Sequence, residues 1–319
     1  MLLEASEPDL NLVADIGGTN TRVALTRRAH TVPHDIKRYH NADHAGLSDV
    51  LKQYIHDVGA NPAHIIGVCA AAAGTVQNGV ATLTNLDWRI DRREIEQALS
   101  ARKIAVLNDL QAQGHALNQI AAAHLINIVP HPPAPAHATK LVVGIGTGFN
   151  ACAVFDTKIG TFVPPSEAGH IALPASDATI APIVADMIAR FGFASVEEVL
   201  SGRGIAYIHD ILHKTPLTTP EVMARLRADD PAAKDTARVF ARIMGAVVGD
   251  LALIHLPLGG IYLVGGVANA FAPYLATLGF VEALRAKGRF SSVMSQFGVQ
   301  IVTDDYAALI GCAAHLAKL

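Results

Sequence analysis

The sequence predicts an α/β protein built from two related domains, and three observations lead to this prediction. The chain has 319 residues, of which 51% are hydrophobic and 17% charged, so it can form more than one sizeable core. Apolar runs typical of buried strands alternate with segments of helical spacing. A strand–turn–strand segment at residues 10–25 returns at residues 141–155, which indicates an internal duplication.

The first copy is a predicted hairpin with a glycine turn. Val13 and Ile16 are strand formers that precede Gly17-Gly18, and the glycines supply the backbone freedom of a sharp turn. The N–H groups of such a turn can hold phosphate, and Asp15 at the strand end can hold a hydrated Mg²⁺. A plain hairpin without a ligand explains the same residues, so the turn alone leaves both interpretations open.

Further elements are expected between the two copies. They are strands at 36–39, 64–72, 79–83 and 104–107, and helices at 47–58, from Asp91, and from 110 to about 123. The run at 64–72 is continuously apolar, as in a buried parallel strand. Asp91 has the chemistry of an N-cap, with Glu94 at capping-box spacing. Asp109 is expected to cap the helix that follows it.

The second copy repeats the first hairpin with one chemical difference. The expected alignment pairs Leu12 with Leu141, Ile16 with Ile145, Gly17 with Gly146 and Ala24 with Ala153. Asp15 becomes Gly144, so only the first copy carries a carboxylate. Two glycine hairpins on facing domains can hold a polyphosphate from both sides.

The rest of the chain continues the alternation of helices and strands. The expected elements are a loop at 164–170, mainly helices at 181–255, a strand at 260–264 that enters a glycine turn, a strand at 299–302 and a helix at 307–319. Residues 251–281 lack Asp, Glu, Lys and Arg, but proline and glycine divide this stretch into short pieces. We therefore expect no membrane span.

The segment Asp15-Ile16-Gly17-Gly18-Thr19-Asn20 resembles the first phosphate loop of the bacterial glucokinase family, within the actin/hexokinase/heat-shock-chaperone superfamily. The resemblance runs almost from end to end. It implies two actin-like, ribonuclease-H-like domains with a cleft between them, a small one at 1–110 plus 304–319 and a large one at 111–303. The nucleotide-binding residues that it implies are Ala14, Asp15, Ile16, Gly17, Gly18, Thr19, Asn20, Gly146, Thr147, Gly148, Gly265 and Gly266.

Charge, cysteine spacing and the first residues predict the partners and the compartment of the protein. The net charge of -3 and the pI near 6.6 provide no basic field for a nucleic-acid backbone. Cys69, Cys152 and Cys312 lie far apart in apolar runs, so we expect reduced thiols in a cytoplasmic protein. The first residues lack a basic segment followed by a long apolar one, which predicts no signal peptide.

Asp109 is the candidate catalytic base. It follows the strand at 104–107, at the strand end where ligands bind in an α/β sheet, and a carboxylate there can accept a hydroxyl proton. Asn108 can bond a sugar hydroxyl. Spacing alone favours a helix cap at Asn108-Asp109, whereas the match to the family's catalytic Asn-Asp favours catalysis.

Glu167 and His170 are candidate sugar ligands. A glutamate and a histidine three residues apart in a glycine-containing loop can bond neighbouring pyranose hydroxyls, although a lone histidine on the surface is common. The family pattern is Gly-Glu-Gly-Gly-His, and here Ser166 and Ala168 replace its first and third residues. The zinc-binding cysteines of the related repressor/kinase group are missing, so the resemblance implies no zinc.

Two further residues enter through the resemblance. Glu197 matches the family's Glu-x-Val-Leu-Ser-Gly, whose glutamate contacts the sugar, although a shift of one residue would select Glu198. Asn85 matches Thr-Asn-x-x-Trp and is expected to reach a sugar hydroxyl. Without the family match, the two glutamates are a solvated charge pair and Asn85 is a turn residue.

Some residues depart from the family near the expected nucleotide. Phe149-Asn150 stands where the family usually has Leu-Gly, and Ala268-Asn269-Ala270 stands where it often has a proline and a basic residue. These changes leave the choice of phosphoryl donor open. No Gly-x-x-x-x-Gly-Lys-Ser/Thr sequence is present, so the chain is not a P-loop kinase.

Together these features predict a kinase that transfers phosphate from ATP, with Mg²⁺, to the 6-hydroxyl of glucose. The alternatives are a kinase for another hexose or an amino sugar, and a sugar-sensing regulator without turnover. A chaperone-type ATPase would not need Glu167 and His170. The resemblance also implies a homodimer.

Overall fold

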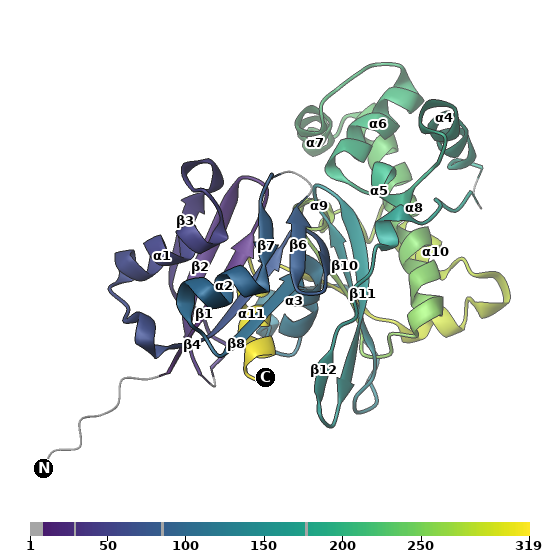
Figure 1. Ribbon diagram of the computed structural model, residues 1–319. Coiled ribbons are helices and arrows are strands. Elements are labelled where there is room, and N and C mark those ends of the chain that lie inside the picture. The colour runs from purple at the N-terminus through teal and green to yellow at the C-terminus, as the bar shows by residue number, and fades with distance from the viewer. Residues whose placement is uncertain (1–8, 29, 84–85, 176–177) are drawn as a thin grey trace, which may run out of the picture. The chain divides into compact units, whose positions relative to one another are not determined.

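The computed structural model describes residues 9–28, 30–83, 86–175 and 178–319 (Figure 1). The chain forms two compact units, one with residues up to Ile120 plus Asp304–Leu319 and the other with Ala121–Thr303. These are called unit 1 and unit 2. The boundary expected at residue 110 falls inside a helix, and the contacts place it ten residues later.

Unit 1 is built on a five-stranded sheet. Its strands are β1 (Leu10–Ile16), β2 (Asn20–Arg27), β3 (His34–His40), β4 (Ile65–Ala72), β5 (Gly74–Gln77), β6 (Val80–Leu83), β7 (Arg89–Asp91) and β8 (Lys103–Asn108), and its α-helices are α1 (Leu47–Val58), α2 (Arg92–Leu99), α3 (Asp109–Ala116) and α11 (Ala307–Leu316). The main sheet has the order β3-β2-β1-β4-β8, and β5-β6-β7 form a small antiparallel sheet.

Alternation along the strands gives unit 1 a core on each face of its sheet. Leu12 and Ile16 of β1 lie in a core that includes residues of α1 and α2. Val13 lies on the other face, in a core with Leu309 and Cys312 of α11. The C-terminal helix α11 therefore packs in unit 1, beside α3 (Figure 1).

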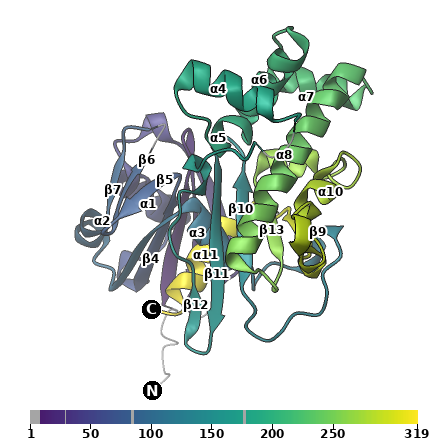
Figure 2. The same ribbon diagram turned by 90° about the vertical axis from the view of Figure 1, so that its right-hand side faces the viewer.

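Unit 2 contains the second sheet and most of the helices. Its strands are β9 (Leu125–Val129), β10 (Lys140–Ile145), β11 (Phe149–Thr157), β12 (Gly160–Phe162), β13 (Ile261–Val264) and β14 (Val299–Val302), and its α-helices are α4 (Ala181–Phe191), α5 (Val196–Val199), α6 (Gly202–His213), α7 (Thr219–Arg227), α8 (Pro231–His255), α9 (Gly266–Phe271) and α10 (Phe280–Arg285). The sheet order is β12-β11-β10-β13-β14-β9, and the long α8 packs against α10 (Figure 2).

The order of the five strands in the sheet of unit 1 recurs in five strands of unit 2, to which β9 is added, and this confirms the internal repeat. In both, the first strand of a hairpin pairs with its partner antiparallel and with the next crossover strand parallel. The expected residue alignment is wrong in the second strand, because the first turn is one residue longer. Val13 pairs with Ala24, whereas its counterpart Val142 pairs with Cys152, so Ala24 corresponds to Cys152 and not to Ala153.

Two local predictions need correction. The helix expected to reach residue 123 ends at Ala116, because the chain there leaves unit 1 for β9. Asp91 caps α2 by accepting from Arg93 N at 2.9 Å, but Glu94 pairs with Arg89 at 3.1 Å and closes no capping box.

The uncharged stretch at residues 251–281 is divided among several elements. It contains the end of α8, the strand β13, the short helix α9 and the turns between them. Within the ranges that the structure describes, no helix combines the length and the apolar character needed to cross a bilayer.

Candidate active site

In unit 1, two candidate carboxylates lie at the same edge of the sheet. The parallel register aligns Ile16 of β1 with Ala72 of β4, and Ala72 with Asn108 of β8. Asp15, the second-last residue of β1, and Asp109, the first residue after β8, therefore lie near strand ends at one level, and their strands are two spacings, or about 10 Å, apart. The carboxyl edge of a parallel sheet is where α/β proteins bind ligands.

Asp15 is covered on most sides, and Arg22 is its ionic partner. Its side chain is 23% exposed, and Arg22 Nη1 lies 3.5 Å from Asp15 Oδ2. Arg22 also donates to the carbonyl of Asp305 at 3.2 Å. Burial raises the pKa of Asp15, and the positive charge of Arg22 offsets this only in part. A carboxylate in this state gains from a further cation, which fits the expected role beside Mg²⁺.

The glycine turn after β1 is braced by Asn41, a residue that the sequence reasoning missed. Asn41 is 1% exposed, and its Nδ2 donates to Gly17 O at 2.8 Å while its Oδ1 accepts from Thr21 Oγ1 at 2.8 Å. Its backbone N–H donates to Thr19 O at 2.9 Å. Asn41 thus binds the carbonyls of Gly17 and Thr19, and Gly18 and Thr19 are exposed at the tip of the turn.

The helix that follows β8 was expected to be capped by Asp109, but its N-cap is Asn108. Asn108 Oδ1 accepts from Gln111 N at 2.6 Å, and Gln111 Oε1 accepts from Asn108 N at 3.2 Å. Asp109 Oδ1 accepts from Leu110 N at 2.8 Å. The spacing Asn-x-x-Gln is a capping box, and it was a signal that could have shown this.

In unit 2, the second glycine turn touches a predicted sugar ligand. Gly146 N donates to Gly148 O at 2.9 Å, and Gly202 N at the start of α6 donates to Gly146 O at 2.8 Å. Glu197 Oε2 accepts from Phe149 N at 3.0 Å. A Cβ on Gly148 would lie 2.4 Å from the same Oε2. The turn and Glu197 therefore fit together closely.

The Glu167–His170 loop lies beside Glu197. Leu173 N donates to Ala194 O at 2.8 Å, and Val196 N donates to Ile171 O at 3.0 Å, so the two segments run side by side. A Cβ on Gly169 would lie 2.2 Å from Phe149 O and 3.3 Å from Glu197 Cβ. Glu167 and His170 are exposed. Three predicted sugar ligands thus gather around the end of one hairpin.

Arg203 distinguishes Glu197 from Glu198. It bonds both oxygens of Glu198, at 2.8 and 3.1 Å, but only Oε1 of Glu197, at 3.2 Å. These contacts, Glu198 first, raise the pKa of Arg203. Glu198 is a surface ion-pair partner, whereas Glu197 also contacts the hairpin. The sequence reasoning missed Arg203, because it lies on α6 while both glutamates lie on α5, and no helical spacing connects them.

The turn at Gly265-Gly266 has one glycine that packing explains and one that it does not. Gly265 has a φ of +101°, and a Cβ there would lie 2.5 Å from Ile145 O, so the strand-to-helix turn itself requires glycine. Gly266 is exposed, and a Cβ would meet no heavy atom within 4 Å in the described part of unit 2. Backbone at Gly266 is therefore open to a ligand.

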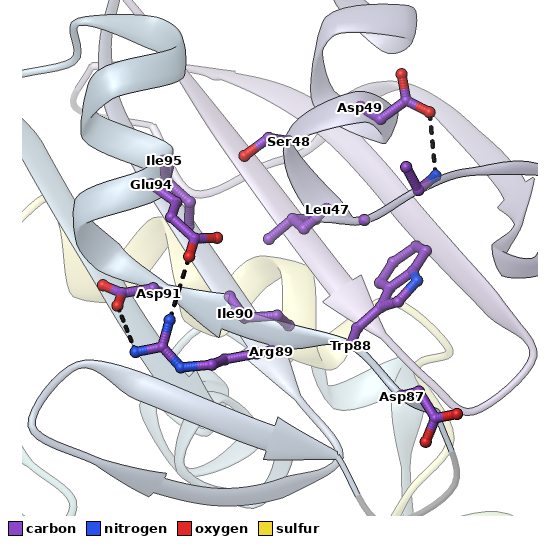
Figure 3. Close-up of a pocket in the computed structure, with 12 residues that line it drawn as sticks. Leu47, Ser48, Asp49, Asp87, Trp88, Arg89, Ile90, Asp91, Glu94 and Ile95 are labelled. Carbon is purple, nitrogen blue, oxygen red and sulfur yellow. Dashed lines mark hydrogen bonds and ion pairs between the residues drawn. The ribbon is translucent and has the colours of Figure 1, made fainter.

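Some predicted site residues stand apart from these groups. Asn85 lies outside the described residues. Ala14 and Ile16 are fully buried, backbone included, so neither residue presents surface to a nucleotide. Trp88 is half-buried and lines a cavity of about 330 Å³ in unit 1, where Arg89 pairs with the acidic side chains beside it (Figure 3). None of the predicted site residues that the structure describes lines this cavity.

Comparison with known proteins gives the family. The family model described as Glucokinase matches residues 12–319. The chain belongs to the glucokinase family. It is 31% identical over 315 residues to the glucokinase of Marinobacter nauticus, with 97% of each chain covered. It is 32% identical over 312 residues to that of Chromohalobacter salexigens, with 96% of this chain and 97% of the relative covered.

Solved structures agree with this membership. A glucokinase from an Antarctic psychrotroph superposes with a TM-score of 0.87 at 30% identity, covering 97% of this chain and 99% of the other. A Balamuthia mandrillaris glucokinase in complex with glucose gives a TM-score of 0.76 at 18% identity, over 99% and 96% of the two chains. At that identity the second likeness shows the shared actin-like fold alone.

Proposed function

We propose that this chain transfers the γ-phosphoryl group of ATP to the 6-hydroxyl of glucose. The observation that carries the proposal is Asp109, which stands with Asn108 and Asp15 at the carboxyl edge of a glucokinase-family sheet. Phosphoryl transfer needs positioned reactants, charge neutralisation and an acceptor for the hydroxyl proton. Unit 1 supplies the last of these through Asp109.

Asp109 takes the proton of the sugar hydroxyl as that oxygen bonds to the γ-phosphorus. The bond between the γ-phosphorus and the bridging oxygen breaks, and ADP leaves with the electron pair. Such a base contributes typically ~10²–10⁴-fold to the rate. Asn108 uses its Oδ1 in the cap, which leaves its Nδ2 to donate to a sugar oxygen.

Asp15 is the residue that would hold Mg²⁺, through water. Its partly exposed carboxylate is a hard oxygen ligand, and because burial raises its pKa despite Arg22, a further positive charge would stabilise the ionised form. The ion, when bound, supplies neutralisation of phosphate charge. In the described ranges no group of three or more His, Cys, Asp or Glu side chains is arranged to hold a metal, and we propose no zinc.

Unit 2 recognises the sugar and contributes phosphate contacts. Glu167, His170 and Glu197 bond the glucose hydroxyls, which the exposure of the first two and the contact of the third with the hairpin support. The open face of Gly146 lets the turn approach a phosphate. The glucose complex of the Balamuthia relative, and a Streptomyces griseus kinase in complex with glucose and AMPPNP, support this assignment of substrates.

The test is ADP formation from ATP and Mg²⁺ with a panel of hexoses and amino sugars, for the native chain and Asp109→Ala. Turnover that depends on glucose and collapses in the variant supports the proposal. Turnover with a different sugar would support the same mechanism with another substrate. The changes at Ser166 and Ala168 make such a change of substrate possible. Tight sugar binding without turnover in both proteins makes the chain a sensor.

We also propose a cytoplasmic homodimer. Cys69, Cys152 and Cys312 are buried free thiols, which suits a reducing compartment. Phe191 and Phe193, at and after the end of α4, are 56% and 51% exposed and offer an apolar surface to a second copy. Light scattering on the native chain and on Phe191→Ser/Phe193→Ser tests the dimer, and an unchanged mass in the variant removes this surface from the proposal.

A further inference from the structure

Asn150 holds the loop that carries Glu167. Its Nδ2 donates to Ser166 O at 2.5 Å, and its Oδ1 accepts from Ala168 N at 2.9 Å. The same Oδ1 accepts from Ala151 N at 2.8 Å, which fixes the amide plane. The two contacts to the loop lie on either side of Glu167, so one side chain sets the backbone immediately before and after that residue.

The repeat shows why Asn150 is available for this contact. In the first hairpin, Asp15 pairs with Arg22 across the strands and the two side chains form an ion pair. At the matching register of the second hairpin, Gly144 pairs with Asn150. Gly144 has no side chain to engage its partner, so Asn150 reaches a different segment. The cross-strand pair of the first copy has become a link from hairpin to loop in the second.

The neighbouring residue connects the same strand to the second acid. Phe149 N donates to Glu197 Oε2, and Phe149 O lies against Gly169. Two consecutive residues of β11 thus fix Glu197 and the Glu167 loop relative to the Gly146–Gly148 turn. Displacement of a binding group by about 1 Å can cost on the order of 10²-fold in rate, so such a brace has a functional consequence.

We propose that Asn150 is a positioning residue that sets sugar affinity through Glu167. The inference rests on the proposed function, because it assigns Glu167 to the sugar. Asn150 need not touch the substrate. It fixes the loop in which Ser166 and Ala168 stand at two positions where the family pattern has glycine.

The experiment compares Asn150→Ala with Asn127→Ala, a matched control in the same unit. Asn127 Oδ1 accepts from Gln300 Nε2 at 2.6 Å on an exposed part of the sheet, away from the loop. Asn150→Ala should raise KM for glucose by about 10-fold, the equivalent of one well-placed hydrogen bond, with a smaller change in kcat and KM for ATP. The control should leave all three values within about twofold.

A double-mutant cycle with Glu167→Gln separates positioning from a general structural role. If Asn150 acts through Glu167, Asn150→Ala adds little further rise in KM in the Glu167→Gln background. The inference is overturned if Asn150→Ala raises KM for glucose equally in both backgrounds, or leaves it unchanged. The proposed function is judged separately, and glucose turnover by the native chain supports it. Failure of the native chain to turn over any sugar overturns both.

A second variant covers the case in which Asn150→Ala does not fold. Asn150→Asp keeps the shape and the acceptor for Ala151 N and Ala168 N, but it cannot donate to Ser166 O. KM for glucose should then rise in the same direction. An unchanged KM in a folded Asn150→Asp protein counts against the inference.

Discussion

Two alanine substitutions on one turn, Gly146→Ala and Gly148→Ala, should separate nucleotide binding from sugar binding. A Cβ on Gly146 meets no heavy atom within 4 Å in the described part of unit 2, whereas a Cβ on Gly148 lies 2.4 Å from Glu197 Oε2. Neither glycine has a φ in the left-handed region, so alanine fits both backbones. The two variants therefore differ in what the new methyl group meets.

The magnitudes follow from these distances. Ordinary contact begins near 3.4 Å, so Gly148→Ala must move the Glu197 carboxylate by about 1 Å and stretch its 3.0 Å bond to Phe149 N beyond hydrogen-bond range. A charge-assisted hydrogen bond of this kind contributes about 1.5–3 kcal/mol, and a 1 Å displacement can cost ~10²-fold. We expect kcat/KM for glucose to fall ~10–100-fold. Gly146→Ala should change stability by less than about 1 kcal/mol and raise KM for ATP.

The assay is coupled ADP release, with glucose and ATP varied in turn, alongside thermal unfolding of each variant. Gly148→Ala should affect mainly the glucose parameters, and Gly146→Ala mainly the ATP parameters. An unchanged KM for ATP in Gly146→Ala would refute phosphate contact at this turn. Normal glucose kinetics in Gly148→Ala would refute the assignment of Glu197 to the sugar.

Three further predictions concern unit 1. Asp109→Asn should lower kcat ~10²–10⁴-fold while calorimetric glucose binding persists, and loss of binding with a normal kcat would contradict the role of base. Asn41→Ala leaves Thr21 without its buried partner, so the free energy of unfolding in urea should fall by about 1–3 kcal/mol, and an unchanged midpoint would show that the brace is dispensable. His315 lies 3.2 Å from His115, and burial, with Lys318, lowers its pKa, so the neutral form favours the folded state. Stability should be fully present above about pH 6.5 and fall as the pH drops toward the lower folded-state value, and His315→Gln should weaken this dependence in urea titrations at several pH values.

The order of elements could be predicted because local patterns determine it. The glycine turns flanked by apolar strands gave both hairpins, and the uninterrupted apolar run gave β4. The end of α3 could not be predicted in this way, since Ala121–Ala123 have high helix propensity. There the chain must pass into unit 2 and pair β9 with β14, a long-range contact that local propensity does not contain.

The site was predicted as a set of residues, but not as a set of contacts. Glu197 and Glu198 are equivalent in local sequence, and only the positions of Phe149 and Arg203 distinguish them. Asn41 is one polar residue in a polar segment, and its two contacts to the turn and one to β2 arise from the pairing of β2 with β3. Such braces depend on register, which a mostly polar strand without buried residues, such as β3, specifies weakly.

The structure also changes the balance between competing explanations of the same residue. A helix cap was the main rival to catalysis at Asp109, and the capping box formed by Asn108 and Gln111 now accounts for that helix start. The opposite holds at Gly265, where a positive φ and contact with Ile145 require glycine whether or not a nucleotide binds. The nucleotide-binding assignment at that turn consequently depends on the open backbone of Gly266, whereas at Asp109 the N-cap position belongs to Asn108 and the Asp109 carboxylate bonds only the first-turn Leu110 N–H among the helix contacts described above.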